Sequence, residues 1–421
     1  MDAIRLGALV SLGLFAMACA QTKTADSVFS TNSQSLCAQQ ASQKRFIVQW
    51  EDGRYTVESD SSPEEFKSGF VKHNLRKIKH VDYDYNIQLS PQDMLTQGDQ
   101  VGAQTLESLN WQVSNIQADQ LYTQNIFGDG VTIAVIDGMV DVTNNQLKPN
   151  ILINTGEIPS NQIDDDNNGF IDDYMGIQVN HEINDPTVNR HGSHVAGIIA
   201  ADPSKGVVQG IAPRAKILPA QFIGNGENGS IGDAIIAMNY AGTRGAKIIN
   251  MSWGIQTCSQ ISTLQSALQK LSSAGILLVT AAGNGDDRGV GFNTDINPMI
   301  PGAYNLLNQI NVAASTASDF LTGFSNYGIR TVHVAAPGFN VQSTIPGNSV
   351  VSMSGTSMAA PAVSGAAALL WSAIPSATAT QIKQAIMKTV DIRTGANMEV
   401  ASHGRINVSR ALVELKRITG Q

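Results

Sequence analysis

The spacing of apolar residues predicts a small folded unit near the N-terminus. Residues 45–50 read as a strand, residues 63–73 have the three-to-four-residue spacing of a helix, and residues 78–89 alternate as a strand does. Together they predict an α+β unit over residues 45–90. A unit of this size buries too little surface to be very stable alone.

The rest of the chain, residues 107–421, alternates between continuous apolar strands and helices. The predicted strands are 131–136, 215–221, 247–251 and 276–280; a helix begins near His191, and further helices cover 231–243 and 261–273. Strands that are apolar on both faces and alternate with helices indicate a parallel sheet covered on both sides. We therefore expect an α/β fold of three layers.

The first residues have the pattern of an export signal. Arg5 precedes an apolar stretch that ends at Ala18, and the chain then becomes polar. This assigns residues 1–18 to a signal and predicts an extracellular or cell-envelope protein. Residues 16–19 resemble a bacterial lipobox, in which Cys19 would carry a lipid, whereas residues 18–20 resemble an ordinary cleavage site with release of the protein. We expect residues 19–44 to be flexible and residues 91–106 to form a linker.

Composition narrows the possible partners. The chain of 421 residues has a formal net charge of −8, which argues against nucleic acid as a partner. No segment after the signal is long and apolar enough to span a bilayer, so membrane contact would come only through a lipid on Cys19. Three cysteines are too few for a disulfide scaffold, and Cys37 and Cys258 are expected to be unpaired unless an oxidising compartment joins them. We expect a monomer.

The first candidate for chemistry is Ser357. It lies in Gly355-Thr356-Ser357, a tight turn that opens a helix of small residues. The N-terminus of a helix presents backbone N–H groups and a dipole that favours negative charge. Attack of a hydroxyl on a carbonyl creates negative charge at that place, so the position suits a nucleophile.

Three further candidates follow or precede predicted elements. Asp137 closes the first buried strand, His191 begins a helix, and Asn284 follows the strand that ends at Thr280. Functional groups gather at the carboxyl ends of strands in parallel sheets. Each candidate also has an ordinary interpretation, since Asp and Gly-Asn are common in turns and His191 with His194 could bind a metal. No Glu follows His191 as in zinc proteases, so we expect His194 to be structural.

The order of these residues, each in an extended phrase, resembles that of the subtilisin-like serine proteases. The phrases run Ala134 to Asp137, His191 to Gly197, Ala281 to Asn284, Phe324 to Gly328, Ala335 to Gly338, Gly355 to Ala359 and Gly404 to Asn407. The resemblance covers roughly residues 107–417 and implies a three-layer subtilisin-like fold. It also implies that residues 45–90 are a propeptide that inhibits the enzyme and assists its folding.

The resemblance implies an exported serine endopeptidase that matures by cutting itself within or near residues 90–110. Ser357 would attack a peptide carbonyl, His191 would accept and return the proton, and Asp137 would orient the imidazole. Asn284 and the Ser357 N–H would bind the oxyanion.

The same resemblance implies a cleft for protein or peptide substrates. Ser252, Trp253 and Gly254 would pair with the substrate backbone, and Asn228 with Gly229 would form the second wall.

One departure supports an alternative. The family usually has Asp-Ser/Thr-Gly, but here the turn reads Asp137-Gly138-Met139. An altered turn would favour Asp141 as a substitute, or a catalytically impaired, surface-anchored binding protein on the same scaffold. An esterase would share the chemistry, but the peptide-pairing strand argues against it.

A structural calcium ion is the expected cofactor. The family's frequent calcium-binding Asp is lost in Asn144 to Leu147, but residues 164–173 space their oxygen ligands as an EF-hand loop does. The candidate ligands are Asp164, Asp166, Asn168, Phe170, Asp172 and Asp173. Carboxylates this close repel one another without a cation. The alternative is a solvated acidic turn.

Overall fold

The computed structural model describes residues 23–29, 41–89, 109–179, 189–224, 228–256, 260–393 and 398–421. The predictions for the signal, Cys19, Cys37, Cys258 and the linker 91–106 fall outside these residues. Among the described helices, none has the length and apolar character needed to cross a membrane.

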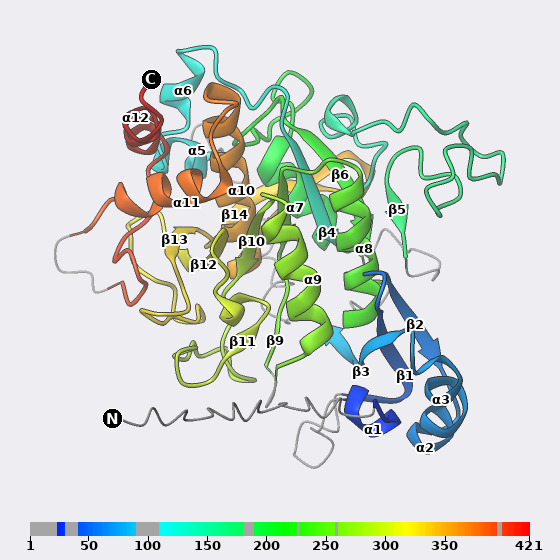
Figure 1. The fold of residues 1–421 in the computed structure, drawn as a ribbon. Helices are drawn as coiled ribbons and strands as arrows, with labels where there is room; N and C mark the ends of the chain where they lie inside the picture. The colour runs from blue at the N-terminus through cyan, green and yellow to red at the C-terminus, as the bar shows by residue number, and fades with distance from the viewer. Residues whose placement is uncertain are drawn as a thin grey trace, which may run out of the picture.

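A parallel sheet forms the centre of the large domain (Figure 1). Its described strands run in the order β13, β12, β10, β8, β4, β6, β5, and every neighbouring pair is parallel. Their bounds are Thr132–Asp137 (β4), Ile177–Gln178 (β5), Lys216–Gln221 (β6), Ile248–Met251 (β8), Leu277–Ala281 (β10), Gln309–Ser315 (β12) and Val334–Pro337 (β13). Four of these strands were predicted within one residue at each end; β5, β12 and β13 were not predicted.

Helices cover both faces of this sheet, which confirms the three layers. Ile133 and Val135 of β4 lie in one core with α7 (His191–Ala200) and α10 (Thr356–Ala373). Ala134 and Ile136 point to the opposite face and lie in a second core with α8 (Ile231–Thr243) and α9 (Ser262–Ser273). The alternation follows from the two-residue period of a strand, and because both faces are buried the strand sequence is continuously apolar.

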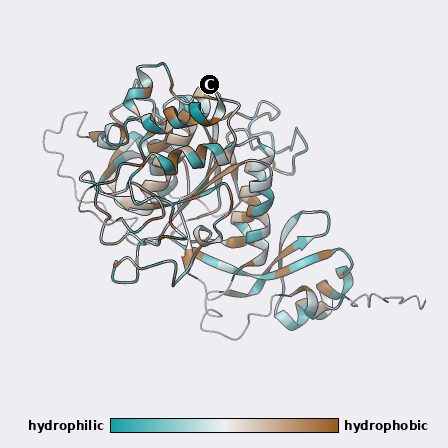
Figure 2. Cartoon of the chain, turned by 60° about the vertical axis from the view of Figure 1, so that its left-hand side comes forward, coloured by the Kyte–Doolittle hydropathy of each residue, from teal (hydrophilic) through white to brown (hydrophobic). Residues whose placement is uncertain are grey.

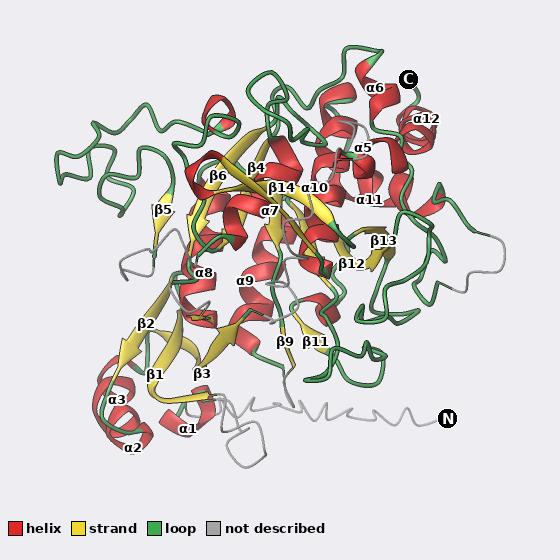
Figure 3. Cartoon of the chain, turned by 180° about the vertical axis from the view of Figure 1, so that it is seen from behind, coloured by secondary structure: helices red, strands yellow, loops and turns green. Residues whose placement is uncertain are grey.

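Shorter elements surround the sheet. The helices are α5 (Trp111–Asn115), α6 (Asp119–Tyr122), α11 (Ala379–Lys388) and α12 (Val408–Thr419), with 3-10 turns at Lys148–Asn150, Gly302–Tyr304 and Pro346–Asn348. The strands are β7 (Asn228–Ser230), β9 (Ile255–Gln256), β11 (Met299–Ile300), β14 (Val341–Ile345) and β15 (Ser349–Met353). Seen from behind, long loops lie next to β5 (Figure 3).

The N-terminal unit is a small sheet with helical turns on one side. Strand β1 (Ala41–Trp50) lies between β2 (Tyr55–Ser59) and β3 (Ile78–Gln88) and is antiparallel to both. The helical segment comprises α2 (Pro63–Phe66), a π-helical stretch (Lys67–Val71) and α3 (Lys72–Asn74). Figure 2 shows this unit projecting from the larger body, with hydrophobic segments along its strands.

Part of the segment expected to be flexible, residues 19–44, has regular secondary structure where it is described. Residues 25–28 form α1 (Ala25–Val28), and β1 begins at Ala41. Val28 and Phe29 are buried, and the Phe29 ring packs edge-on against Phe46 and Phe66. These two apolar residues, together with an ion pair between Asp26 and Lys67, join this turn to the unit's core.

The unit docks on the paired helices of the large domain. Figure 1 shows α8 and α9 side by side, with the small sheet beneath them. The end of β3 also extends the contact, because Asn86, Ile87 and Gln88 pair antiparallel with β7.

Candidate active site

Asp137 and His191 form a buried pair. Asp137 is the last residue of β4 and His191 the first of α7, and both are fully buried. The His191 Nδ1 lies 2.7 Å from the Asp137 Oδ1. The carboxylate therefore holds the proton on Nδ1, which leaves Nε2 as the basic nitrogen of the neutral ring. Asp141 lies elsewhere: its oxygens accept from Thr143 and from the Gly347 N–H.

The unusual turn after Asp137 keeps this pair intact. The Gly138 N–H donates to the Asp137 Oδ1 at 2.6 Å, and the Met139 N–H donates to the Asn189 Oδ1 at 3.0 Å. The following helix packs directly on the turn, since a Cβ on Gly192 would lie 2.3 Å from the Gly138 carbonyl oxygen. The turn and the start of α7 are therefore one packed unit.

Ser357 lies in the first turn of α10, where backbone N–H groups are not paired within the helix. Its hydroxyl donates to the Ser252 carbonyl at 3.0 Å, and the Ser252 hydroxyl donates to the Ser357 carbonyl at 2.9 Å. The Asn250 amide donates to the Ser252 hydroxyl at 2.9 Å. Reciprocal bonds thus tie the start of α10 to the segment after β8, the strand between β4 and β10.

Asn284 is fixed by the residue before Ser357. The Asn284 Oδ1 accepts from the Thr356 N–H at 2.8 Å and from the Thr356 hydroxyl at 2.9 Å. The same hydroxyl accepts from the Gly283 N–H at 3.0 Å. With its oxygen held in this way, the amide of Asn284 presents its Nδ2 as the donor end.

Thr356 and Asn326 had no predicted role, although both lie in segments that resemble the family, residues 355–359 and 324–328. Asn326 accepts from the Gly285 N–H and donates to the Ala282 carbonyl, so it braces the turn that carries Asn284. Gly283 has a φ of +99°, and a Cβ there would lie 2.5 Å from the Asn326 Nδ2. The turn therefore requires glycine both by conformation and by space.

The predicted substrate residues lie in two places, the segment that follows β8 and the strand β7. The Ser252 side chain contacts the Ser357 backbone, whereas the Trp253 side chain is buried and donates to the Ile136 carbonyl at 2.9 Å. Gly254 follows and is half-buried, with Ile300 close beside it. Asn228 and Gly229 belong to β7 and are paired with β3.

The second histidine of the phrase His191 to Gly197, His194, is bonded to the backbone of β15. It is fully buried, and its Nε2 donates to the Val351 carbonyl at 3.0 Å. Burial lowers its pKa to about 3, although the Val351 bond opposes this. A neutral donor held by a carbonyl agrees with the structural role expected for it.

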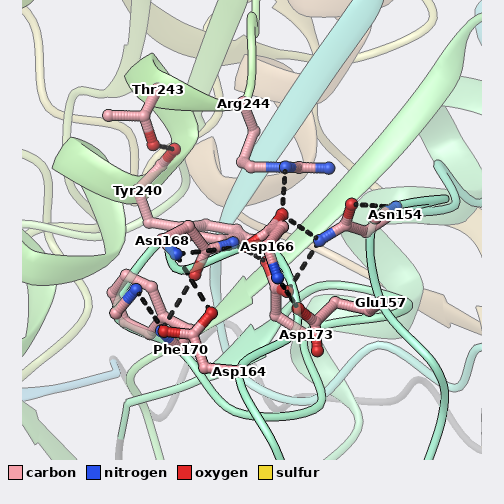
Figure 4. Close-up of polar contacts among 12 residues, drawn as sticks. Asn154, Glu157, Asp164, Asp166, Asn168, Phe170, Asp173, Tyr240, Thr243 and Arg244 are labelled. Atoms are coloured by element: carbon pink, nitrogen blue, oxygen red, sulfur yellow. Dashed lines mark hydrogen bonds and ion pairs between the residues drawn. The ribbon is translucent and has the colours of Figure 1, made fainter.

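The acidic loop brings together three carboxylates (Figure 4). One oxygen each from Glu157, Asp164 and Asp166 lies within 4.8 Å of the others. Glu157 was not predicted as a ligand, because it precedes residues 164–173 and has no place in their EF-hand-like spacing. Its Oε1 accepts from the Asp166 N–H at 3.1 Å, and its buried Oε2 has no hydrogen-bond partner among the described residues.

The other expected ligands are arranged around this cluster. Asn168 donates from its Nδ2 to Asp173, and its Oδ1 accepts from the Phe170 N–H. Asp173 is buried and also accepts from Asn154 and the Tyr240 hydroxyl. Asp172 points away, because both its oxygens accept backbone N–H groups of residues 161 and 162.

One cation already faces the cluster. The Arg244 Nη1 lies 3.2 Å from the Asp166 Oδ2. Hydrogen bonds from Asn154 and Asn168, together with Arg244, lower the pKa of Asp166. One guanidinium offsets one of three carboxylates, so the cluster retains an excess of negative charge.

Comparison with known proteins agrees with this fold. Residues 128–410 match the model of the subtilase family. The chain is 36% identical over 285 residues to a thermostable alkaline protease of Halalkalibacterium halodurans, covering 67% of this chain and 68% of that protein. It is 33% identical over 332 residues to a thermophilic serine proteinase of Bacillus sp. strain AK1, covering 79% and 71%. It is 31% identical over 294 residues to subtilisin Savinase of Lederbergia lenta, covering 69% and 95%.

The family match and these protease relatives show that the chain is a serine endopeptidase with a parallel three-layer α/β domain. The chain belongs to the subtilase family.

Proposed function

We propose that Asp137, His191 and Ser357 are the catalytic triad of this subtilase, with Asn284 as the oxyanion donor. The 2.7 Å contact between Asp137 and His191 carries the proposal, because it gives the ring the tautomer that a general base needs. It also weighs against the impaired binding protein, which depended on a disrupted Asp137 turn. The family's protease relatives do not favour that alternative either.

The proposed roles give the following reaction. Ser357 loses its proton to the His191 Nε2 as its Oγ bonds to the peptide carbonyl carbon, and the charge on the carbonyl oxygen is met by the Asn284 amide and the Ser357 N–H. His191 then gives the proton to the leaving amine, and water repeats the sequence on the acyl-enzyme.

Replacement of each triad member tests the assignment. We expect Ser357→Ala to abolish cleavage of casein, and Asp137→Ala to lower kcat by roughly 10⁴. Ser372→Ala is the matched control, because Ser372 lies on the same helix and donates only to the Leu369 carbonyl. An active Asp137→Ala variant with an inactive Asp141→Ala variant would transfer the role to Asp141.

We further propose that the N-terminal unit is an inhibitory propeptide of an exported precursor. Two observations support this: β3 pairs with β7, which includes the expected substrate residues Asn228 and Gly229, and β3 carboxylates contact the N-termini of α8 and α9. Mass spectrometry of the wild type and Ser357→Ala tests self-processing, because only the wild type should lose the unit. Whether export ends in free release or in lipid on Cys19 is tested by the same N-terminal masses.

Calcium is the proposed structural cofactor of the acidic loop. Glu157, Asp164 and Asp166 fit a divalent cation because their oxygens converge and the Glu157 Oε2 is buried without a partner among the described residues. Phe170 and Asn168 adjoin the cluster, whereas Asp172 is directed to an outer turn. Arg244 bonds Asp166 and Tyr240 bonds the neighbouring Asp173, both from the C-terminal end of α8. The chain passes from there to the amino end of β8, whereas Asp137 lies at the carboxyl end of β4, so an ion there would be structural.

The melting temperature of Ser357→Ala, with calcium and with chelator, tests this site without autolysis. Ligand at a hundredfold excess over Kd stabilises the folded state by about 2.7 kcal/mol. Adding Glu157→Gln should remove the calcium-dependent shift, and adding Asp172→Asn should retain it. An unchanged melting temperature after chelation would contradict the proposal.

A further inference from the structure

Gly138 stands where the family pattern has Ser or Thr, and space explains the difference. A Cβ on Gly138 would lie 2.4 Å from the Asn189 Oδ1, far inside van der Waals contact. The φ of Gly138 is not in the left-handed region, so the backbone conformation does not require glycine. The side chain of Asn189 therefore occupies the place of the missing side chain.

Asn189 links the turn to two other parts of the site. It is buried, with 1% of its surface exposed, and precedes His191 by two residues. Its Oδ1 accepts from the Met139 N–H at 3.0 Å, and its Nδ2 donates to the Ile223 carbonyl at 3.2 Å. The Ile223 N–H in turn lies 3.3 Å from the Asp137 carbonyl oxygen. Asn189 thus ties the turn after Asp137 to the segment after β6.

The position of this turn matters because Asp137 is held on one side only. Its Oδ1 accepts from both His191 and the Gly138 N–H, while its buried Oδ2 has no hydrogen-bond partner among the described residues. A hydrogen bond to Oδ2 would resist rotation of the carboxylate. Without one, a shift of the Gly138–Met139 backbone moves Oδ1 relative to the imidazole.

We propose that Asn189 is a positioning residue for the Asp137 carboxylate and that Gly138 and Asn189 act as a matched pair. The proposal rests on the proposed triad. Asn189 holds the Met139 N–H, this fixes the Gly138 N–H, and the Gly138 N–H sets the direction of Oδ1. In the family pattern a Ser or Thr side chain follows the Asp. Here the Asn189 side chain, two residues before α7, fills that space.

A double-mutant cycle tests the pair. We expect Asn189→Ala to lower kcat by about 10-fold with KM changed less than 2-fold, the loss that the bond from the Met139 N–H represents. The acid limb of the kcat/KM profile should move to lower pH, because a displaced carboxylate stabilises the protonated imidazole less. Gly138→Ala should be more harmful with Asn189 present than in the Asn189→Ala background, where its methyl group has room.

Two controls separate positioning from general stability. Asn150→Ala removes a buried asparagine that donates to the Ala200 and Pro213 carbonyls, so it should lower the melting temperature and leave kcat and the acid limb unchanged. Gly323→Ala adds a methyl group where no atom lies within 4 Å. It should change nothing.

The outcomes distinguish the two proposals. If Asn189→Ala behaves as Asn150→Ala does, or if the two substitutions are additive, Asn189 does not position Asp137. If Asp137→Ala is fully active, the triad assignment itself fails. If Gly138→Ala does not fold, the kcat and the acid limb of Asn189→Ala still show whether Asn189 positions Asp137.

Discussion

At the scale of single residues, the chemistry depends on polar groups that are nearly excluded from water. Asp137, His191 and Ser357 expose at most 3% of their surface, and Asn284 exposes 6%. Buried polar groups need partners of fixed geometry, and Thr356 supplies one by binding both Gly283 and Asn284. The nucleophile and the oxyanion donor are therefore set by neighbouring residues of one turn.

Asn284→Ala should lower kcat by about 10²–10³ and leave KM nearly unchanged, because the lost donor acts in the transition state. Thr356→Val should have a smaller effect of the same kind, since it releases the Asn284 Oδ1 but keeps the amide. Steady-state kinetics on one peptide substrate measure both. Thr389→Val is the matched control, because its hydroxyl bonds only the Ala385 carbonyl within α11. A kcat within threefold of wild type for Asn284→Ala would argue against its role.

At the scale of elements, two acidic residues of β3 bind the ends of two helices. The Asp84 Oδ1 accepts from the Gly232 N–H of α8 at 2.8 Å, and the Asp82 Oδ2 accepts from the Thr263 N–H of α9 at 2.7 Å. Carboxylates are stabilising at helix N-termini because of the unpaired N–H groups and the dipole. Burial raises the pKa of Asp84, which the Gly232 bond and Arg45 oppose.

Asp84→Ala should weaken docking of the N-terminal unit by roughly 10- to 150-fold, because hydrogen bonds to a charged group contribute about 1.5–3 kcal/mol. In the full chain this should shorten the lag before peptidase activity appears. Asp52→Ala is the matched control, since Asp52 pairs with Arg54 in an exposed turn of the same unit. Equal lags for the two variants, at equal yields of folded precursor, would show that the Asp84 contact does not limit release.

At the scale of the whole molecule, we expect two buried histidines to make the free energy of unfolding depend on pH. His194 and His333 are buried, and burial lowers the pKa of each to about 3. His194 lies against His191, Arg190 and the Val351 carbonyl, and His333 lies against Lys383 and Asn305. Both rings therefore stay neutral in the folded state over most of the acidic range.

Stability should fall as the pH drops from about 6.5 toward 3. In this window the unfolded chain binds protons at His194 and His333, whereas the folded chain does not. Proton binding therefore lowers the free energy of the unfolded state and destabilises the fold. In the Ser357→Ala background, His194→Gln should reduce the slope of melting temperature against pH, since glutamine keeps a donor for Val351. His73→Gln, on an exposed histidine, should not. Equal slopes for all three proteins would contradict this explanation.

Local pattern was enough for much of the fold. The continuous apolar runs predicted β4, β6, β8 and β10, because strands buried on both faces cannot alternate. The small strands β14 and β15 and the sheet's edge at β12, β13 and β5 were not predicted. Strands β5 and β13 have only two and four residues, too few to show a pattern. Strands β12, β14 and β15 mix polar and apolar residues without the continuous apolar run of the central strands.

Residue types at short separations were enough to predict the α/β class, the chain order Asp137, His191, Asn284, Ser357 and the EF-hand-like spacing of residues 164–173. Which atoms meet depends instead on how segments pack in three dimensions. This packing brought Glu157 into the acidic cluster and turned Asp172 away, and it set Asn189 beside Gly138. These contacts join residues that lie 9 to 51 positions apart in the chain, and packing alone brings them together. At such contacts a difference of about one ångström separates a hydrogen bond from a clash.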